Sequence, residues 1–156
     1  MGPPIEKPPE DIVQYYNEWL DGDGFPFWSF WDNIRTWWEI RDLPNVLFLH
    51  YNNLKEDMPG GIRRMADFLD IEINEESWPK ILKHCSFDYM KENATKSTPL
   101  GGLFWDEGAK VFIHQGQNGR WRDLLSAEDI ARYERIAVQK LGEECAYWLA
   151  TGKLKS

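Results

Sequence analysis

Apolar residues recur at helical spacing in several stretches of the chain, and residues that start or stop helices bound each stretch. Prolines precede the first stretch, and Asp21–Gly24 ends it. Ser29 and Ser126 are predicted N-caps of two others, and Asp129 completes an approximate capping box with Ser126. The apolar positions that define these helices are Ile12, Tyr15, Tyr16 and Trp19; Trp31, Ile34, Trp37 and Trp38; Ile62, Met65, Ala66, Phe68 and Leu69; and Ile130, Tyr133, Ile136, Ala137, Leu141, Cys145, Trp148 and Leu149.

Two shorter helices are predicted between Asp70 and Asn93. Asn74 can cap the first of them, and Pro79 confines its regular part to the residues after the proline. The second contains Phe87 and ends near Asn93.

The run Asn45–Tyr51 has a different pattern. It is apolar and aromatic, too short for a helix of its own, and bounded by Pro44 and two asparagines, which predicts a strand buried on both faces inside a parallel sheet. The other strand candidate is the short segment Lys110–His114. Because a buried strand needs hydrogen-bond partners along both edges, we expect its neighbours in a missing N-terminal half, in a second copy of the chain, or in an unforeseen antiparallel pairing. The expected fold class is α/β, mostly helical with one buried parallel-type strand.

The domain organisation that this pattern predicts is simple. Residues 1–9 are proline-rich and form an extended lead-in, and residues 10–152 form a single, incomplete domain. Residues 94–121 are rich in glycine and poor in periodic pattern, which is typical of a lid or binding loop.

Charge narrows the range of partners. The 156 residues carry 26 acidic against 18 basic side chains, a net charge of −8, which excludes a general nucleic-acid-binding surface. An anionic nucleotide can still be held locally.

The sequence also bears on cellular location. It has no run of about 18 apolar residues that would predict a membrane span. The segment 1–9 lacks the apolar core of a signal peptide. Cys85 and Cys145 lie within or beside helical patterns, so we expect reduced, buried thiols in a cytoplasmic protein.

Aromatic residues are unusually abundant, with nine Trp, eight Phe and six Tyr. Most are expected in the core, packed against the sheet, although a Trp stripe can also form an aromatic binding site or an interface. A carbohydrate-binding module built on such Trp platforms is a further interpretation that rests on composition alone.

The order of the predicted elements resembles that of a known family. A strand that ends in Tyr51 is followed by two helices and then by the motif Ser86-Phe87-x-x-Met90-Lys91. This order resembles the C-terminal half of the cytosolic-type sulfotransferases, which move a sulfuryl group from 3'-phosphoadenosine 5'-phosphosulfate (PAPS) to an alcohol, phenol or amine. The ending Gly119–Arg122 is similar to bacterial members. The resemblance implies the C-terminal part of a P-loop-like α/β fold of roughly twice this length, with the N-terminal half absent.

The resemblance implies a set of adenine contacts. Tyr51 matches the family tyrosine that approaches the base. Cys85 stands where the family has Thr, and Ser86, Phe87 and Met90 match its Ser-Phe-x-x-Met, in which the Phe packs on the adenine face.

A second motif, Phe112–Arg122, resembles the family segment Phe-x-Arg-Lys-Gly-x-x-Gly-Asp-Trp-Lys that closes on the 3'-phosphate. His114 and Gln115 replace its Arg and Lys, and Gly116 is retained. The neutral Gln115 gives up a charge-assisted hydrogen bond worth about 1.5–3 kcal/mol.

Several motifs are absent from the sequence. It contains neither a Gly-x-x-x-x-Gly-Lys loop, nor the family's Pro-Lys-Ser-Gly-Thr loop for the 5'-phosphosulfate, nor its Lys-x-His general base, nor a metal-binding pattern. We therefore assign no catalytic residue and no metal ligand, and expect the chain alone to be inactive toward its small-molecule hydroxyl acceptor. A non-catalytic, aromatic-rich interaction module derived from a sulfotransferase is the alternative.

Overall fold

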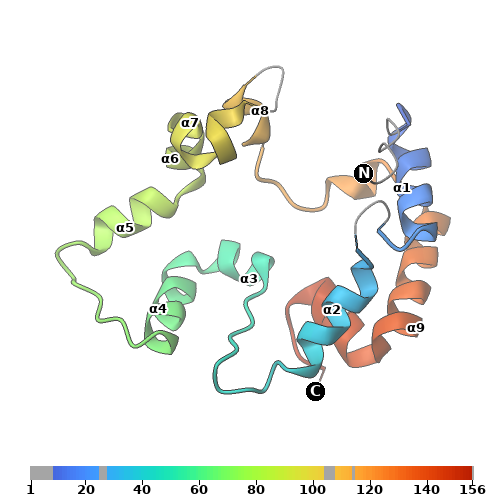
Figure 1. Ribbon diagram of the computed structural model, residues 1–156, viewed down its shortest axis with the longest axis horizontal. Coiled ribbons are helices and arrows are strands. Elements are labelled where there is room, and N and C mark those ends of the chain that lie inside the picture. The colour runs from blue at the N-terminus through green and yellow to red at the C-terminus, as the bar shows by residue number, and fades with distance from the viewer. Residues whose placement is uncertain (1–8, 25–27, 104–107, 114, 156) are drawn as a thin grey trace, which may run out of the picture. The chain divides into compact units, whose positions relative to one another are not determined.

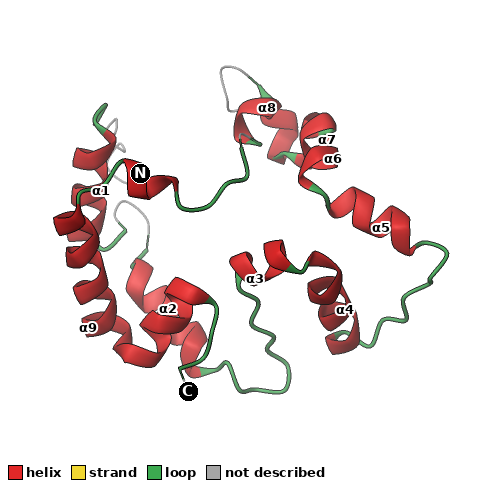
Figure 2. Cartoon of the chain, turned by 180° about the vertical axis from the view of Figure 1, so that it is seen from behind, coloured by secondary structure: helices red, strands yellow, loops and turns green. Residues whose placement is uncertain are grey.

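The computed structural model describes residues 9–24, 28–103, 108–113 and 115–155. Within these ranges the regular secondary structure is helical throughout, as Figure 2 shows. The chain forms two compact units: unit 1 comprises Met1–His50 and Gly119–Ser156, and unit 2 comprises Tyr51–Asn118. The expected lead-in lies outside the described residues up to residue 8.

Unit 1 contains the helices α1 (Ile12–Asp21), α2 (Phe30–Glu39), α9 (Ala127–Thr151) and the 3-10 helix η2 (Arg120–Asp123) (Figure 1). The carboxylate of Asp11 accepts hydrogen bonds from the amides of the first turn, so α1 begins after Asp11 rather than at the prolines. Ser29 caps α2, as predicted. Ser126 and Asp129 form the predicted capping box at the start of α9.

Helix α9 is interrupted at Gly142, whose backbone lies at φ 78° and ψ 163° and is therefore not helical. The interruption bends α9 into two segments, 127–141 and 143–151 (Figure 1). Gly152, in a left-handed conformation, ends the second segment.

The core of unit 1 is aromatic. Trp31, 2% exposed, lies between Phe30 and Tyr133, with ring centroids 4.9 Å and 5.5 Å away. Trp38, 9% exposed, packs on Trp148 of the second segment of α9 at 5.4 Å. Trp31 and Trp38 of the Trp stripe of α2 are therefore core, as predicted, but they pack against α9 and not against a sheet. Trp37 of the same stripe is 55% exposed, so the prediction was wrong for this residue.

The expected strand at Asn45–Tyr51 does not form in the described structure. Val46–His50 has no regular secondary structure and is half-buried rather than buried on both faces, and Tyr51 begins a helix. Phe48 and His50 contact the ring of Trp148 at 5.3 Å and 5.2 Å. No described residue forms a hydrogen bond with the backbone of Leu47, Phe48 or Leu49, so nothing in the described structure holds this segment in a sheet.

Unit 2 contains α3 (Tyr51–Glu56), α4 (Met58–Phe68), α5 (Trp78–Cys85), α6 (Phe87–Glu92), α7 (Ala94–Ser97), α8 (Ala109–Phe112) and the 3-10 helix η1 (Pro99–Gly102). The prediction of a strand at Lys110–His114 was wrong, because α8 occupies most of that segment. The prediction that Asn74 caps a helix was also wrong: its side chain accepts from the amide of Glu76 in a turn, and α5 begins later.

Unit 2 buries only small side chains in its described part. Ala66, Ala94, Thr98 and Ala109 are less than 10% exposed. Large apolar side chains stay open to solvent, with the exposed fraction reaching 61% at Leu69, 70% at Leu100 and 81% at Leu103. Apolar burial is the main stabilising term in folding, so unit 2 has little of it within its own described residues.

Candidate functional site

Ser86 lies between α5 and α6, and its hydroxyl forms a hydrogen bond with each of the two helices. The backbone at Ser86 is extended, its Oγ accepts from the amide of Tyr89 at 3.2 Å, and its hydroxyl donates to the carbonyl of Lys83 at 2.7 Å. A hydroxyl has one proton and two lone pairs. Ser86 therefore has one acceptor position left, and can accept from an amino group but not donate to a ring nitrogen.

Phe87, the next residue, lies directly against Gly116. A β-carbon at Gly116 would stand 2.6 Å from Cδ2 and Cε2 of the Phe87 ring, closer than real β-carbons approach. The backbone of Gly116 is also left-handed, at φ 61°. Both facts require glycine here, and together they bring the predicted phosphate segment onto the predicted adenine residue.

Lys55 links this pair to Tyr51. Its Nζ donates a hydrogen bond to the carbonyl of Gly116 and lies 5.8 Å from the centroid of the Tyr51 ring. Tyr51 is the first residue of α3, and Lys55 lies four residues later on the same helix face. Lys55 was missed at the sequence level, although its spacing from Tyr51 was a usable signal.

A second hydrogen bond holds the same two segments together. The side-chain Nδ2 of Asn118 donates to Oδ1 of Asn52, so α3 and the segment 116–118 are joined by two hydrogen bonds.

Lys91 places a further positive charge beside the site. Its Nζ lies 5.8 Å from the centroid of the Phe87 ring, again from four residues further along one helix. We call Tyr51, Lys55, Phe87, Lys91 and Gly116 the lysine–aromatic cluster. Two aromatic rings bordered by two ammonium groups suit a flat base that carries anionic groups.

Among the described residues, no hydrogen bond, ion pair or ring contact joins the side chains of Cys85, Met90 or Gln115 to this cluster. Cys85 is an exposed free thiol at the end of α5, and Met90 is half-buried on α6. Gln115 is exposed beside Gly116, and His114 lies outside the described residues. Across the described ranges no group of His, Cys, Asp and Glu is arranged to hold a metal ion.

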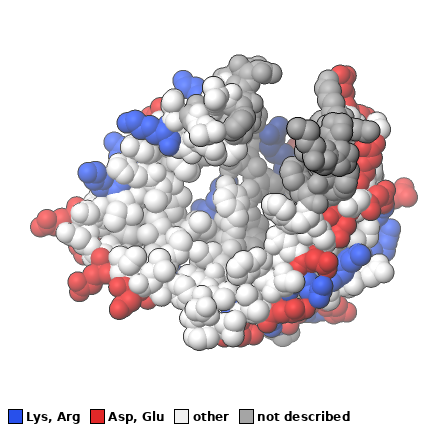
Figure 3. All heavy atoms as spheres, in the orientation of Figure 1, with Lys and Arg blue, Asp and Glu red and all other residues white. Residues whose placement is uncertain are grey.

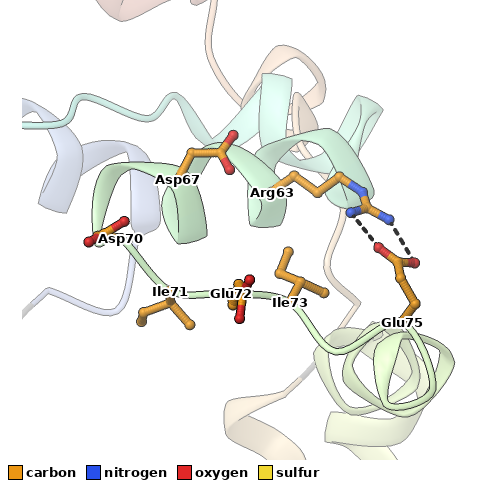
Figure 4. A pocket seen from close by; sticks show the side chains of 7 residues that line it. All are labelled: Arg63, Asp67, Asp70, Ile71, Glu72, Ile73 and Glu75. Carbon is orange, nitrogen blue, oxygen red and sulfur yellow. Dashed lines mark hydrogen bonds and ion pairs between the residues drawn. The ribbon is translucent and has the colours of Figure 1, made fainter.

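A groove of about 640 Å³ lies elsewhere in unit 2, between α4 and the connector that follows it (Figure 4). Four carboxylates line it, from Asp67, Asp70, Glu72 and Glu75. The guanidinium of Arg63, the one cation in its lining, pairs with Glu75 at 3.0 Å. No predicted site residue lines this groove, and its negative charge disfavours a phosphate.

Charge in unit 2 varies along the chain. The connector after α4 carries the carboxylates of Asp70, Glu72, Glu75 and Glu76, whereas α5–α7 carry Lys80, Lys83, Lys91 and Lys96 beside Asp88 and Glu92. In Figure 3 blue and red side chains gather at separate parts of the left side of the molecule. The lysine–aromatic cluster holds two ammonium groups, whereas four carboxylates line the groove, and this difference favours an anionic ligand at the cluster.

Comparison with known proteins gives a consistent picture. The family model described as "Sulfotransferase domain" matches residues 5–144. Sulfotransferase 1C2 of Rattus norvegicus is 30% identical over 131 residues, which cover 83% of this chain and 44% of that protein.

Two solved structures are similar in fold. One is mouse sulfotransferase SULT7A1 complexed with PAP, with a TM-score of 0.75, 24% identity, and coverage of 93% of this chain and 53% of that one. The other is retinol dehydratase in a complex with retinol and PAP, with a TM-score of 0.69, 26% identity, and coverage of 86% and 40%. The chain thus spans about half the length of the proteins it matches, and none of its described helices is long and apolar enough to cross a membrane.

Proposed function

The chain belongs to the sulfotransferase domain family, and we propose that it takes part in transfer of a sulfuryl group from PAPS to a small-molecule hydroxyl acceptor. In this proposal it supplies the part of the enzyme that binds the adenine and the 3'-phosphate. The observation that carries the proposal is the lysine–aromatic cluster, which brings Tyr51, Phe87 and Gly116 together.

The residues present fit an adenine base. The rings of Tyr51 and Phe87 offer flat apolar surface, and the remaining lone pair of Ser86 can accept a hydrogen bond from the 6-amino group. Cys85 and Met90 flank Ser86 and Phe87 in sequence, and we place both in the wall of the same site.

The 3'-phosphate is assigned to the segment His114–Gly116. Gly116 lies against Phe87, so a nucleotide whose base meets the Phe87 ring has this backbone within its reach. Gln115 offers amide donors without charge.

The bound cosubstrate supplies the sulfuryl group that passes to the acceptor oxygen. The chain itself positions the nucleotide, and its sequence has no Lys-x-His segment to remove the proton from the acceptor. We therefore expect no sulfuryl transfer by the isolated chain.

The partner proposed for this chain is a polypeptide that carries the other half of the family's length, with a second copy of the chain as the alternative. Two features support it. The backbone of Leu47–Leu49 has no hydrogen-bond partner among the described residues, and unit 2 leaves large apolar side chains exposed. In the assembled protein Asn45–Tyr51 would pair as a strand and complete an α/β domain, in the cytoplasm.

Calorimetric titration of the chain with 3'-phosphoadenosine 5'-phosphate (PAP) tests the nucleotide role. Phe87→Ala should lower the affinity about 5- to 150-fold, because base–aromatic stacking is worth about 1–3 kcal/mol. Phe68→Ala is the matched control, since Phe68 is an exposed phenylalanine of α4 outside the cluster.

Equal affinity in the two variants would contradict the proposal, as would the absence of binding to the unaltered chain. A chain that binds no nucleotide but associates with itself in size-exclusion chromatography would favour the interaction module instead.

A further inference from the structure

Lys55 carries a charge that its own surroundings do not neutralise. An ammonium group has three N–H donors, and the carbonyl of Gly116 accepts one of them. Its other recorded contact is with the Tyr51 ring, and no carboxylate among the described residues pairs with it. Two donors and a positive charge therefore remain beside the Gly116 carbonyl and the Tyr51 ring.

A purely structural role does not account for a charge at this position. The link between α3 and the segment after Gly116 is also made by Asn118 and Asn52, both of which are neutral. Lys55 is exposed, so its charge stays accessible to a ligand.

We propose that Lys55 binds a phosphate group of the nucleotide, and that it supplies the positive charge that Gln115 does not. This inference rests on the nucleotide-binding role proposed above, and it adds a residue of α3 to the site. A phosphate held there would receive charge-assisted hydrogen bonds from Nζ while the base lies on the rings of Tyr51 and Phe87.

Three substitutions separate charge from tethering. Lys55→Arg keeps the charge and the donors, Lys55→Gln keeps a donor for the Gly116 carbonyl without charge, and Lys55→Met keeps neither. Lys80→Met is the control, because Lys80 is an exposed lysine of α5, in the same unit but outside the cluster.

Each variant is titrated with PAP, adenosine 5'-phosphate, adenosine 3'-phosphate and adenosine, at two salt concentrations. Lys55→Gln and Lys55→Met should both weaken PAP binding about tenfold and reduce its salt dependence. Adenosine binding should stay within about twofold, because it has no phosphate to lose a partner. The monophosphate whose affinity also falls identifies the phosphate that Lys55 contacts. Lys55→Arg and Lys80→Met should resemble the unaltered chain.

Unchanged PAP affinity in Lys55→Gln, with a loss confined to Lys55→Met, would show a tether and overturn the proposal. PAP binding that depends on Phe87 but not on Lys55 would overturn this inference alone. No PAP binding by the unaltered chain would overturn both this inference and the proposed function. Circular-dichroism melting of each variant shows whether a loss reflects unfolding.

Discussion

Replacement of Gly142 by alanine tests the bend in α9. The backbone at φ 78° and ψ 163° lies in a region that is essentially restricted to glycine, and placing another residue there costs about 1–3 kcal/mol. A β-carbon at this position would meet no atom within 4 Å, so no collision with neighbouring side chains adds to that cost. The expected loss of folding free energy is therefore about 1–3 kcal/mol, all of it from the backbone.

A straight α9 predicts that the same substitution raises the free energy of unfolding instead of lowering it. At an exposed position inside a continuous helix, glycine is less favourable than alanine by about 0.8–1.0 kcal/mol, so the same substitution would stabilise the protein. For a chain of this size a change of 1 kcal/mol moves the melting temperature by about 2–4 °C. The bent helix thus predicts a fall of about 2–12 °C, and the straight helix a rise of a few degrees.

Thermal and urea unfolding followed by circular dichroism measure this difference. Ala150→Gly is the control, because Ala150 is an exposed residue of the second segment of α9 and should lose about 1 kcal/mol in either geometry. A Gly142→Ala protein that melts above the unaltered one, while Ala150→Gly melts below it, would refute the bend.

Three further outcomes are expected. Gly116→Ala should weaken PAP binding and lower the free energy of unfolding by about 1–2 kcal/mol, because the new β-carbon meets the Phe87 ring and the backbone is left-handed. Calorimetric titration and thermal melting measure the two effects. Unchanged affinity and stability would contradict the contact between Gly116 and Phe87. Burial raises the pKa of the Cys145 thiol and of the Tyr133 phenol, so both groups stabilise the fold while protonated, and stability should fall as pH rises past their ordinary pKa values in an unfolding series. Iodoacetamide should alkylate exposed Cys85 long before Cys145 in mass spectra of the folded chain; equal rates would refute the burial.

The helices were predictable because their signals are local. Ser29, Ser126 and Asp129 satisfy first-turn amides from within a few residues, and the apolar spacing of α2 and α9 matches the faces that meet in the core. The bend at Gly142 had no such signal, because a positive φ is a property of the backbone and not of an isolated glycine in a helical pattern.

The strand predictions failed for a different reason. A strand is stabilised by partners in other segments, and the described chain offers no hydrogen bond to Leu47–Leu49. The strand at Lys110–His114 was predicted because Val111 and Ile113 are β-branched, but helix α8 begins after Gly108 and includes Val111.

The candidate site was predicted in part. The resemblance pointed to Tyr51, Phe87 and Gly116, which the structure connects, but not to Lys55, whose role depends on a carbonyl far along the chain. The nucleotide-binding roles of all the predicted site residues stay predictions, as do the closer relation to bacterial members and the single domain at 10–152. These residues are Tyr51, Cys85, Ser86, Phe87, Met90, His114, Gln115 and Gly116.

In unit 1, α1 and α2 share a core with α9, and this has a consequence for synthesis. Leu20 and Trp31 are buried against Ala137 and Ala146, which the ribosome adds about 5–25 seconds after them at 5–20 residues per second. Until α9 leaves the exit tunnel, Leu20 and Trp31 lack the α9 surface that covers them in the described core. We therefore expect chaperones that bind hydrophobic segments to associate with the nascent chain before α9 is complete.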